Sequence, residues 1–113
     1  MQPDPATIDV LRELKVRLQR RFGERLIGVH LFGSRARGTH RPDSDADVAV
    51  VLKGRIAHPF AVKRQIIEET YDLLLDRGLY IQPWPIEEGS LEAPDEHPCA
   101  HLSRVVQQEG ITI

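Results

Sequence analysis

The chain has 113 residues, of which 41% are hydrophobic and 28% charged, and its net charge is -2 at pH 7. The length predicts a single domain over residues 1–113, and the nearly balanced charge argues against a globally basic nucleic-acid-binding protein. One cysteine, Cys99, excludes an internal disulfide framework. Because the sequence has no apolar run long enough to span a membrane and no apparent signal peptide, we expect a cytoplasmic protein without membrane contact.

The first half of the chain alternates between helical and strand patterns. Residues 6–22 place apolar side chains at helical spacing and predict a helix with Thr7 as its N-cap. The β-branched and apolar run at 26–33 predicts a strand. Residues 34–44 are rich in small polar residues and predict a loop with room for one helical turn. Residues 47–52 are apolar on both faces, which is typical of a central strand covered on both sides.

The second half continues this alternation. Residues 59–76 predict a second helix, and residues 79–86 begin as a strand. Because Pro83 and Pro85 lack backbone N–H donors, we expect this strand to lie at a sheet edge or to leave the sheet in its second half. The remaining expected elements are a loop over 87–98, a helix over about 100–109 and a terminal strand over 111–113. This order predicts an α/β fold with helices packed on a sheet.

The segment 33–50, GSRARGTHRPDSDADVAV, holds the residues with the clearest chemistry. Gly33 allows close backbone approach or a positive φ, and Ser34 offers a hydroxyl group and a backbone N–H. A Gly-Ser pair that leaves a strand suits a bound phosphate. Arg35 and Arg37 follow, and their guanidinium groups are candidates for charge-assisted contacts with phosphate oxygens.

Two carboxylates enter the second strand together. Asp45 and Asp47 are two residues apart, so strand periodicity places both side chains on one face. Such a pair is suited to ligate one hard cation or to bridge two metal ions during phosphoryl transfer. Magnesium is the expected cation, because it takes one or two protein carboxylates together with substrate phosphate oxygens and water.

Gly33-Ser34, ten intervening residues and Asp45-Ala46-Asp47 together form the pattern GS-x10-D-x-D. With this pattern the chain resembles the minimal nucleotidyltransferases of the DNA-polymerase-β-like nucleotidyltransferase superfamily. The wider GS-x-A-R-G and S-D-x-D patterns of that group are also present. The resemblance implies a mixed sheet of about four strands with helices packed on it.

The resemblance also implies an activity and a partner. A metal-dependent enzyme of this kind transfers a nucleoside monophosphate, here AMP from ATP, to a hydroxyl group. Asp45 and Asp47 would then be the catalytic, Mg²⁺-binding carboxylates. Minimal nucleotidyltransferases often pair with a separate HEPN-domain protein in toxin–antitoxin modules. That pairing implies that this chain is the antitoxin and that its protein partner carries the acceptor hydroxyl.

The chain departs from the family pattern at a third carboxylate. The superfamily usually carries this acid on the strand after the second helix, where this chain has LYIQPWPI and Gln82 near the expected position. An amide cannot act as a base near neutral pH. Glu87 and Glu88 lie farther along and are expected to be solvated. The alternative is therefore a catalytically weak or inactive antitoxin that binds nucleotide and partner and acts by contact.

Other side chains with possible functional roles allow less specific interpretations. His97, Cys99 and His101 form H-x-C-x-H, but this spacing matches no recognised zinc finger, and zinc is not expected. Trp84 is either a core side chain or an anchor for a partner. His30 lies within the first strand and is expected to be packed or hydrogen-bonded. A nucleotide- or RNA-binding module that uses the arginine loop is a third and weaker reading of the whole chain.

Overall fold

A computed structural model describes residues 3–92 and 100–113 of the chain. Its sheet has four strands in the order β3-β2-β1-β4. The strands are β1 (Leu26–Phe32), β2 (Ala46–Leu52), β3 (Ile81–Glu87) and β4 (Ile111–Thr112). Strand β1 runs antiparallel to both of its neighbours, β2 and β4, whereas β2 and β3 are parallel. The expected four-stranded mixed sheet is therefore confirmed.

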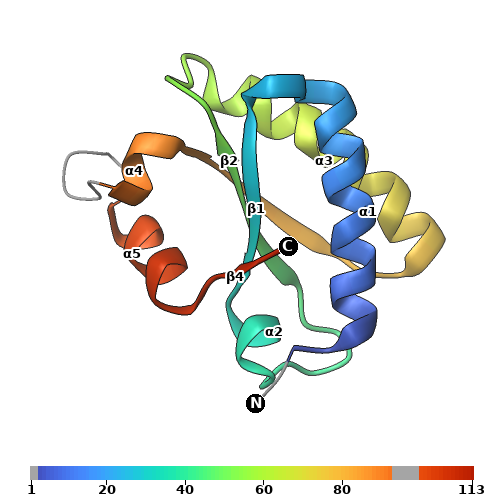
Figure 1. Cartoon of the computed structure of the whole chain (residues 1–113). Helices are drawn as coiled ribbons and strands as arrows, with labels where there is room; N and C mark the ends of the chain where they lie inside the picture. The colour runs from blue at the N-terminus through green and yellow to red at the C-terminus, as the bar shows by residue number, and fades with distance from the viewer. Residues whose placement is uncertain (1–2, 93–99) are drawn as a thin grey trace.

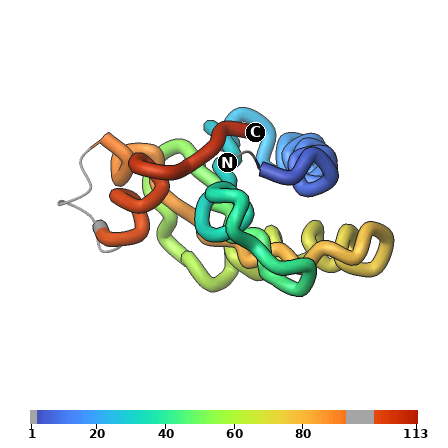
Figure 2. Tube along the Cα trace, turned by 90° about the horizontal axis from the view of Figure 1, so that it is seen from below, coloured from blue at the N-terminus to red at the C-terminus, as the bar shows by residue number. Residues whose placement is uncertain are grey.

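Helices cover both faces of this sheet. They are α1 (Pro5–Phe22), a 3-10 turn η1 (Gly23–Arg25), α2 (Ser34–Arg37), α3 (Pro59–Arg77), α4 (Glu88–Glu92) and α5 (Ala100–Glu109). Helices α1 and α3 lie on one side of the sheet, and α4 and α5 lie on the other (Figures 1 and 2). A separate cluster of apolar side chains fills each interface. Within residues 3–92 and 100–113, no helix has the length and apolar character needed to cross a membrane.

Helix α1 matches the predicted helix, but its N-cap differs. Asp4 caps the helix, and its Oδ1 accepts a hydrogen bond from the backbone N–H of Ala6 at 3.1 Å. Thr7, the expected cap, lies inside the first turn, where its side chain is buried. The prediction was wrong because Pro5 at the first helical position fixes a helical φ and lets the helix begin earlier.

Strand β3 lies at the edge of the sheet, as its prolines predicted. It does not leave the sheet early, because its pairing with β2 continues to Glu87. A proline removes only its own donor, and an edge strand has one side without a partner strand. The expected loop over 87–98 is partly wrong, since α4 begins at Glu88 directly after the strand. Residues 93–98 of that loop lie outside the described part of the chain.

The pairing of the strands brings distant segments together at one end of the sheet. Phe32 is opposite Asp47 in the antiparallel pair of β1 and β2, so the end of β1 meets the start of β2. Strand β4 pairs with β1 through Leu31 and Ile111. The turn after β1, the start of β2 and the end of α5 therefore converge, and α2 stands in the foreground of this end in Figure 2.

Candidate functional site

Gly33 forms the turn between β1 and α2, and it lies directly against Asp47. Its φ is +78°, a value that side-chain-bearing residues rarely adopt. A Cβ at this position would lie 2.5 Å from Oδ2 of Asp47, closer than a carbon and an oxygen can approach. The structure thus gives two reasons for glycine here, the backbone conformation and the carboxylate beside it.

Ser34 is the first residue of α2, a helix of only one turn. The helix ends at Arg37, and its C-cap is Gly38, which adopts the left-handed conformation with φ +76°. The carbonyl oxygen of Ser34 accepts the N–H of Thr39 at 3.0 Å. This tight turn redirects the chain toward β2, so Ser34 and the two aspartates are held at the same end of the sheet.

Asp45 and Asp47 flank a residue that belongs to the core. Ala46 is fully buried and packs in the cluster beneath α1 and α3, so alternation along the strand turns the aspartates the other way. Asp45 is exposed, whereas Asp47 is partly buried. Burial raises the pKa of Asp47 above its ordinary value, and the hydrogen bond from Trp84 lowers it. The charge of Asp45 raises the same pKa.

Arg37 and Glu109 bring a further charge pair to this site. Nη1 of Arg37 lies 3.1 and 3.0 Å from the two carboxylate oxygens of Glu109. Oε1 of Glu109 also accepts the backbone N–H of Gly33 at 2.8 Å. Both residues act on the pKa of Asp47, which Arg37 lowers and Glu109 raises. The end of α5 is therefore part of the site.

Sequence reasoning did not identify Glu109, because its position at the site depends on how β4 pairs with β1. The pairs Leu31–Ile111 and His30–Thr112 define the register of β1 and β4. Extending that register by two residues places Glu109 opposite Gly33. The short ITI strand was predicted, but the sequence does not state which strand it pairs with.

Arg35 was expected to contact phosphate, and the structure gives it a different position. Its side chain is buried, with 6% of its surface exposed. Nε donates to the carbonyl oxygen of Ser44 at 2.9 Å, and Nη1 donates to the hydroxyl of Thr7 at 3.0 Å. Nη2 lies 3.3 Å from the carbonyl oxygen of Pro42. Arg35 thus ties the loop before β2 to α1 and does not line the site as a phosphate contact.

Gln82 and Trp84 line the site from the edge strand. Gln82 pairs with Asp47 across the parallel strands. Nε1 of Trp84 donates to Oδ1 of Asp47 at 3.5 Å, the long limit of a hydrogen bond. Nζ of Lys63 lies 4.5 Å from the centre of the Trp84 ring. Trp84 also packs on the apolar cluster beneath α4 and α5, so its role in packing is established.

The residues at this site fit a divalent cation only in part. The family that the sequence resembles generally uses such a cation, and the carboxylate oxygens of Asp45 and Asp47 are suitable hard ligands. Burial is the main cause of the raised pKa of Asp47, and a bound cation would lower that pKa by stabilising the charged carboxylate. Within residues 3–92 and 100–113, however, no group of three or more acidic, histidine or cysteine side chains has metal-binding geometry. Phosphate and water oxygens would supply the other ligands of a cation held by these two carboxylates.

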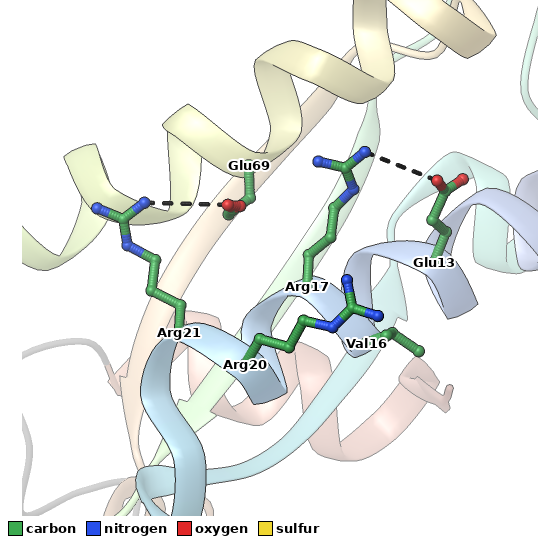
Figure 3. Close-up of a pocket in the computed structure, with 6 residues that line it drawn as sticks. All are labelled: Glu13, Val16, Arg17, Arg20, Arg21 and Glu69. Carbon is green, nitrogen blue, oxygen red and sulfur yellow. Dashed lines mark ion pairs between the residues drawn. The ribbon is translucent and has the colours of Figure 1, made fainter.

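A separate hollow lies between α1 and α3 and has a volume of about 530 Å³. It is lined by Glu13, Val16, Arg17, Arg20, Arg21 and Glu69. Figure 3 shows two of its arginines turned toward glutamates, in the pairs Arg17–Glu13 and Arg21–Glu69. The hollow lies toward the end of α1 that leads into β1, whereas Gly33 follows the opposite end of β1. It is therefore distinct from the site of the two aspartates.

Comparison with known proteins agrees with the geometry. The family model of the nucleotidyltransferase domain matches residues 11–108. A candidate nucleotidyltransferase from Sulfolobus solfataricus is 23% identical, with 98% of this chain and 87% of that chain covered and a TM-score of 0.59. A toxin–antitoxin complex with AMP-PNP is 19% identical, with 88% and 69% covered and a TM-score of 0.58. At these identities the likeness concerns the fold alone. Among curated proteins, none matches the chain significantly.

Proposed function

Because the chain belongs to the nucleotidyltransferase domain family and is thereby a transferase, we propose that it transfers AMP from ATP to a hydroxyl group of a partner protein. The contact between Gly33 and Asp47 carries this proposal. It joins the Gly-Ser turn and the D-x-D carboxylates into one site, although ten residues separate the two motifs. A phosphate-binding turn beside two carboxylates is the arrangement that metal-assisted phosphoryl transfer requires.

Each residue has a defined role in this proposal. The backbone N–H groups of Gly33 and Ser34 and the Ser34 hydroxyl hold the terminal phosphates of ATP. Arg37 adds a guanidinium group that neutralises part of their charge. Asp45 and Asp47 hold Mg²⁺, which when bound stabilises the charge at the reacting phosphorus. The acceptor oxygen forms a bond to the α-phosphorus, pyrophosphate leaves with the broken phosphoanhydride bond, and the hydroxyl proton passes to water.

The acceptor is proposed to be a separate polypeptide. The match to the family spans residues 11–108, which supports an acceptor that is held by a separate molecule. A structural neighbour is a toxin–antitoxin complex with AMP-PNP, which supports a nucleotide substrate and a protein partner. We propose a HEPN-domain toxin as that partner, with this chain as its cytoplasmic antitoxin.

Incubation with α-labelled ATP, Mg²⁺ and the protein encoded beside this chain tests the proposal. Label on the partner protein is the expected result. Substitution of both carboxylates, Asp45→Asn with Asp47→Asn, should remove the label, because it removes the cation ligands. A matched control is Asp43→Asn with Asp76→Asn, which removes the same charge from two exposed positions. Partner binding without any label in the wild-type protein would contradict the transfer.

Gln82 supports a second candidate function. It pairs with Asp47 on the neighbouring strand, where the family usually has an acid. Without that acid, the site retains a place for phosphate and cation but lacks a base for the acceptor hydroxyl. The alternative is therefore an antitoxin that acts by contact with its partner. Toxin neutralisation by the Asp45→Asn/Asp47→Asn variant, which should transfer no label, would favour this alternative.

A further inference from the structure

We propose that the carboxylate of Glu109 is a built-in substitute for a phosphate group, which ATP must displace to bind. This inference rests on the proposed function, because it concerns access to the same site. Glu109 already makes the two contacts that the terminal phosphates are proposed to make. Its Oε1 accepts the N–H of Gly33 at 2.8 Å, and both of its oxygens lie within 3.1 Å of Nη1 of Arg37.

The position of Glu109 in its helix does not account for its presence. Glu109 is the last residue of α5, and that helix has no basic residue in its last turn. A negative charge at a helix C-terminus is unfavourable, because the helix dipole is negative there. The contacts with Gly33 and Arg37 compensate for this placement. Both contacts are made with residues outside α5. They therefore indicate that Glu109 has a role at the site.

The chain after α5 fixes where Glu109 stands. The N–H of Gly110 donates to the carbonyl oxygen of Val106 at 2.8 Å, and a Cβ at Gly110 would collide with that oxygen. A sharp exit from the helix is thus possible only with glycine. Strand β4 then pairs with β1, and the N–H of Ile113 donates to the carbonyl oxygen of Val29 at 2.9 Å. These hydrogen bonds hold the backbone around and after Glu109. Only the side chain of Glu109 can therefore move away from Gly33 and Arg37.

The contact is weak enough to be displaced. The side chain of Arg37 is 52% exposed and that of Glu109 is 25% exposed. Ion pairs with this much solvent exposure contribute little to stability and are screened by salt. A triphosphate carries more charge than one carboxylate and brings a cation with it. ATP therefore displaces the Glu109 carboxylate at sufficient concentration, and Glu109 raises the ATP concentration that binding requires.

Inorganic tripolyphosphate with Mg²⁺ is the probe for this competition, beside ATP with Mg²⁺. Calorimetry gives the affinity, and the amide NMR signal of Gly33 reports on its hydrogen-bond partner. We expect Glu109→Ala to bind both probes about tenfold more tightly than the wild type, the scale of one charge-assisted hydrogen bond. Glu109→Gln removes only the charge and should give a smaller gain. Glu24→Gln, an exposed glutamate in η1, is the matched control and should bind like the wild type.

The possible outcomes separate this inference from the proposed function. Equal affinity in the wild type and both Glu109 variants overturns the inference and leaves the nucleotide site standing. Weaker binding by the Glu109 variants also overturns it, since Glu109 would then assist the ligand. Failure of every variant to bind ATP or tripolyphosphate overturns both proposals. Thermal unfolding of each variant checks folding, and Glu109→Gln retains the side-chain size if Glu109→Ala is unstable.

Discussion

Gln82 and Asp47 occupy paired positions on the parallel strands β3 and β2. Paired residues in parallel strands direct their side chains to the same face of the sheet. Asp47 lies on the face that carries Trp84, which follows Gln82 by two residues. Gln82 therefore lies on the same face of the sheet as Asp47, on the strand next to it.

Gln82→Glu should restore the missing carboxylate with almost no change in side-chain volume. We expect Mg²⁺ to bind about three- to tenfold more tightly, because a third anionic oxygen joins the two aspartates. Label transfer to the partner should increase as well if the missing acid limits turnover. The measurements are Mg²⁺ titration and the labelling rate. Gln65→Glu on the exposed surface of α3 is the matched control, and equal effects of the two variants would contradict the assignment.

Gly33→Ala should lower the free energy of unfolding more than a glycine-to-alanine substitution that adds backbone strain alone. The alanine Cβ meets the Asp47 carboxylate, in addition to the strain at φ +78°. Gly54 has nearly the same φ, +74°, but has open space around it. We expect Gly54→Ala to cost about 1 kcal/mol of unfolding free energy, the strain alone, and Gly33→Ala to cost about 1–2 kcal/mol more. Urea unfolding measures both. Equal losses would show that the Asp47 side chain moves away without cost.

Substitution of Arg35 should mainly lower stability, whereas substitution of Arg37 should mainly weaken ATP binding. Arg35→Met removes a buried guanidinium with three hydrogen bonds and should lower the unfolding free energy by about 2–4 kcal/mol. Arg37→Met removes an exposed ion pair and should change stability by less than about 1 kcal/mol. Only Arg37→Met should weaken ATP binding in the folded protein. Urea unfolding and calorimetry separate the two effects. A folded Arg35→Met variant with normal stability would contradict the structural role.

Sequence patterns predicted the fold well because local signals are strong in this chain. Gly78 ends α3 in the left-handed conformation, and the apolar run of β2 is buried on both faces, as its pattern indicated. Pro83 and Pro85 correctly indicated an edge strand. The capping of α1 was misread because both Asp4 and Thr7 are good capping residues, and only the position of Pro5 distinguishes them.

The site was harder to predict because it depends on contacts between distant segments. Gly33 and Asp47 belong to one local pattern, so their proximity was foreseeable. Arg35 and Arg37 look equivalent in sequence, yet only the structure shows that Arg35 points inward to Thr7 and Ser44. Glu109 lies 76 residues from Gly33. Nothing in the local sequence around Glu109 indicates that contact, since it depends on the register of β4.

His30 should make stability depend on pH in the mildly acidic range. Burial lowers its pKa below the ordinary value of 6.5, and the charge of Lys15 lowers it further. The unfolded chain therefore binds a proton more readily than the folded chain. Stability is full above about pH 6.5 and falls as the pH drops through the lower pKa of the folded state. The neutral ring faces the hydroxyl of Thr112, with Nδ1 and Oγ1 3.3 Å apart.

Urea unfolding at pH 5.5 and 7.5 measures this dependence. His30→Gln should reduce the difference between the two pH values, because it removes the titrating group and keeps a polar side chain. His58→Gln, at an exposed position before α3, is the matched control and should keep the wild-type difference. A wild-type difference that persists in His30→Gln would assign the pH dependence to other groups.

Trp84 should report directly on occupation of the site, because it is the only tryptophan in the chain. Its indole N–H donates to Asp47, so a cation on that carboxylate changes the electrostatic surroundings of the ring. We expect a change in Trp84 fluorescence when Mg²⁺ and ATP are added together, and Asp47→Asn should abolish it. Lys63→Met removes the ammonium group near the ring and should alter the starting fluorescence but keep the response. An unchanged response in Asp47→Asn would place the bound cation away from Asp47.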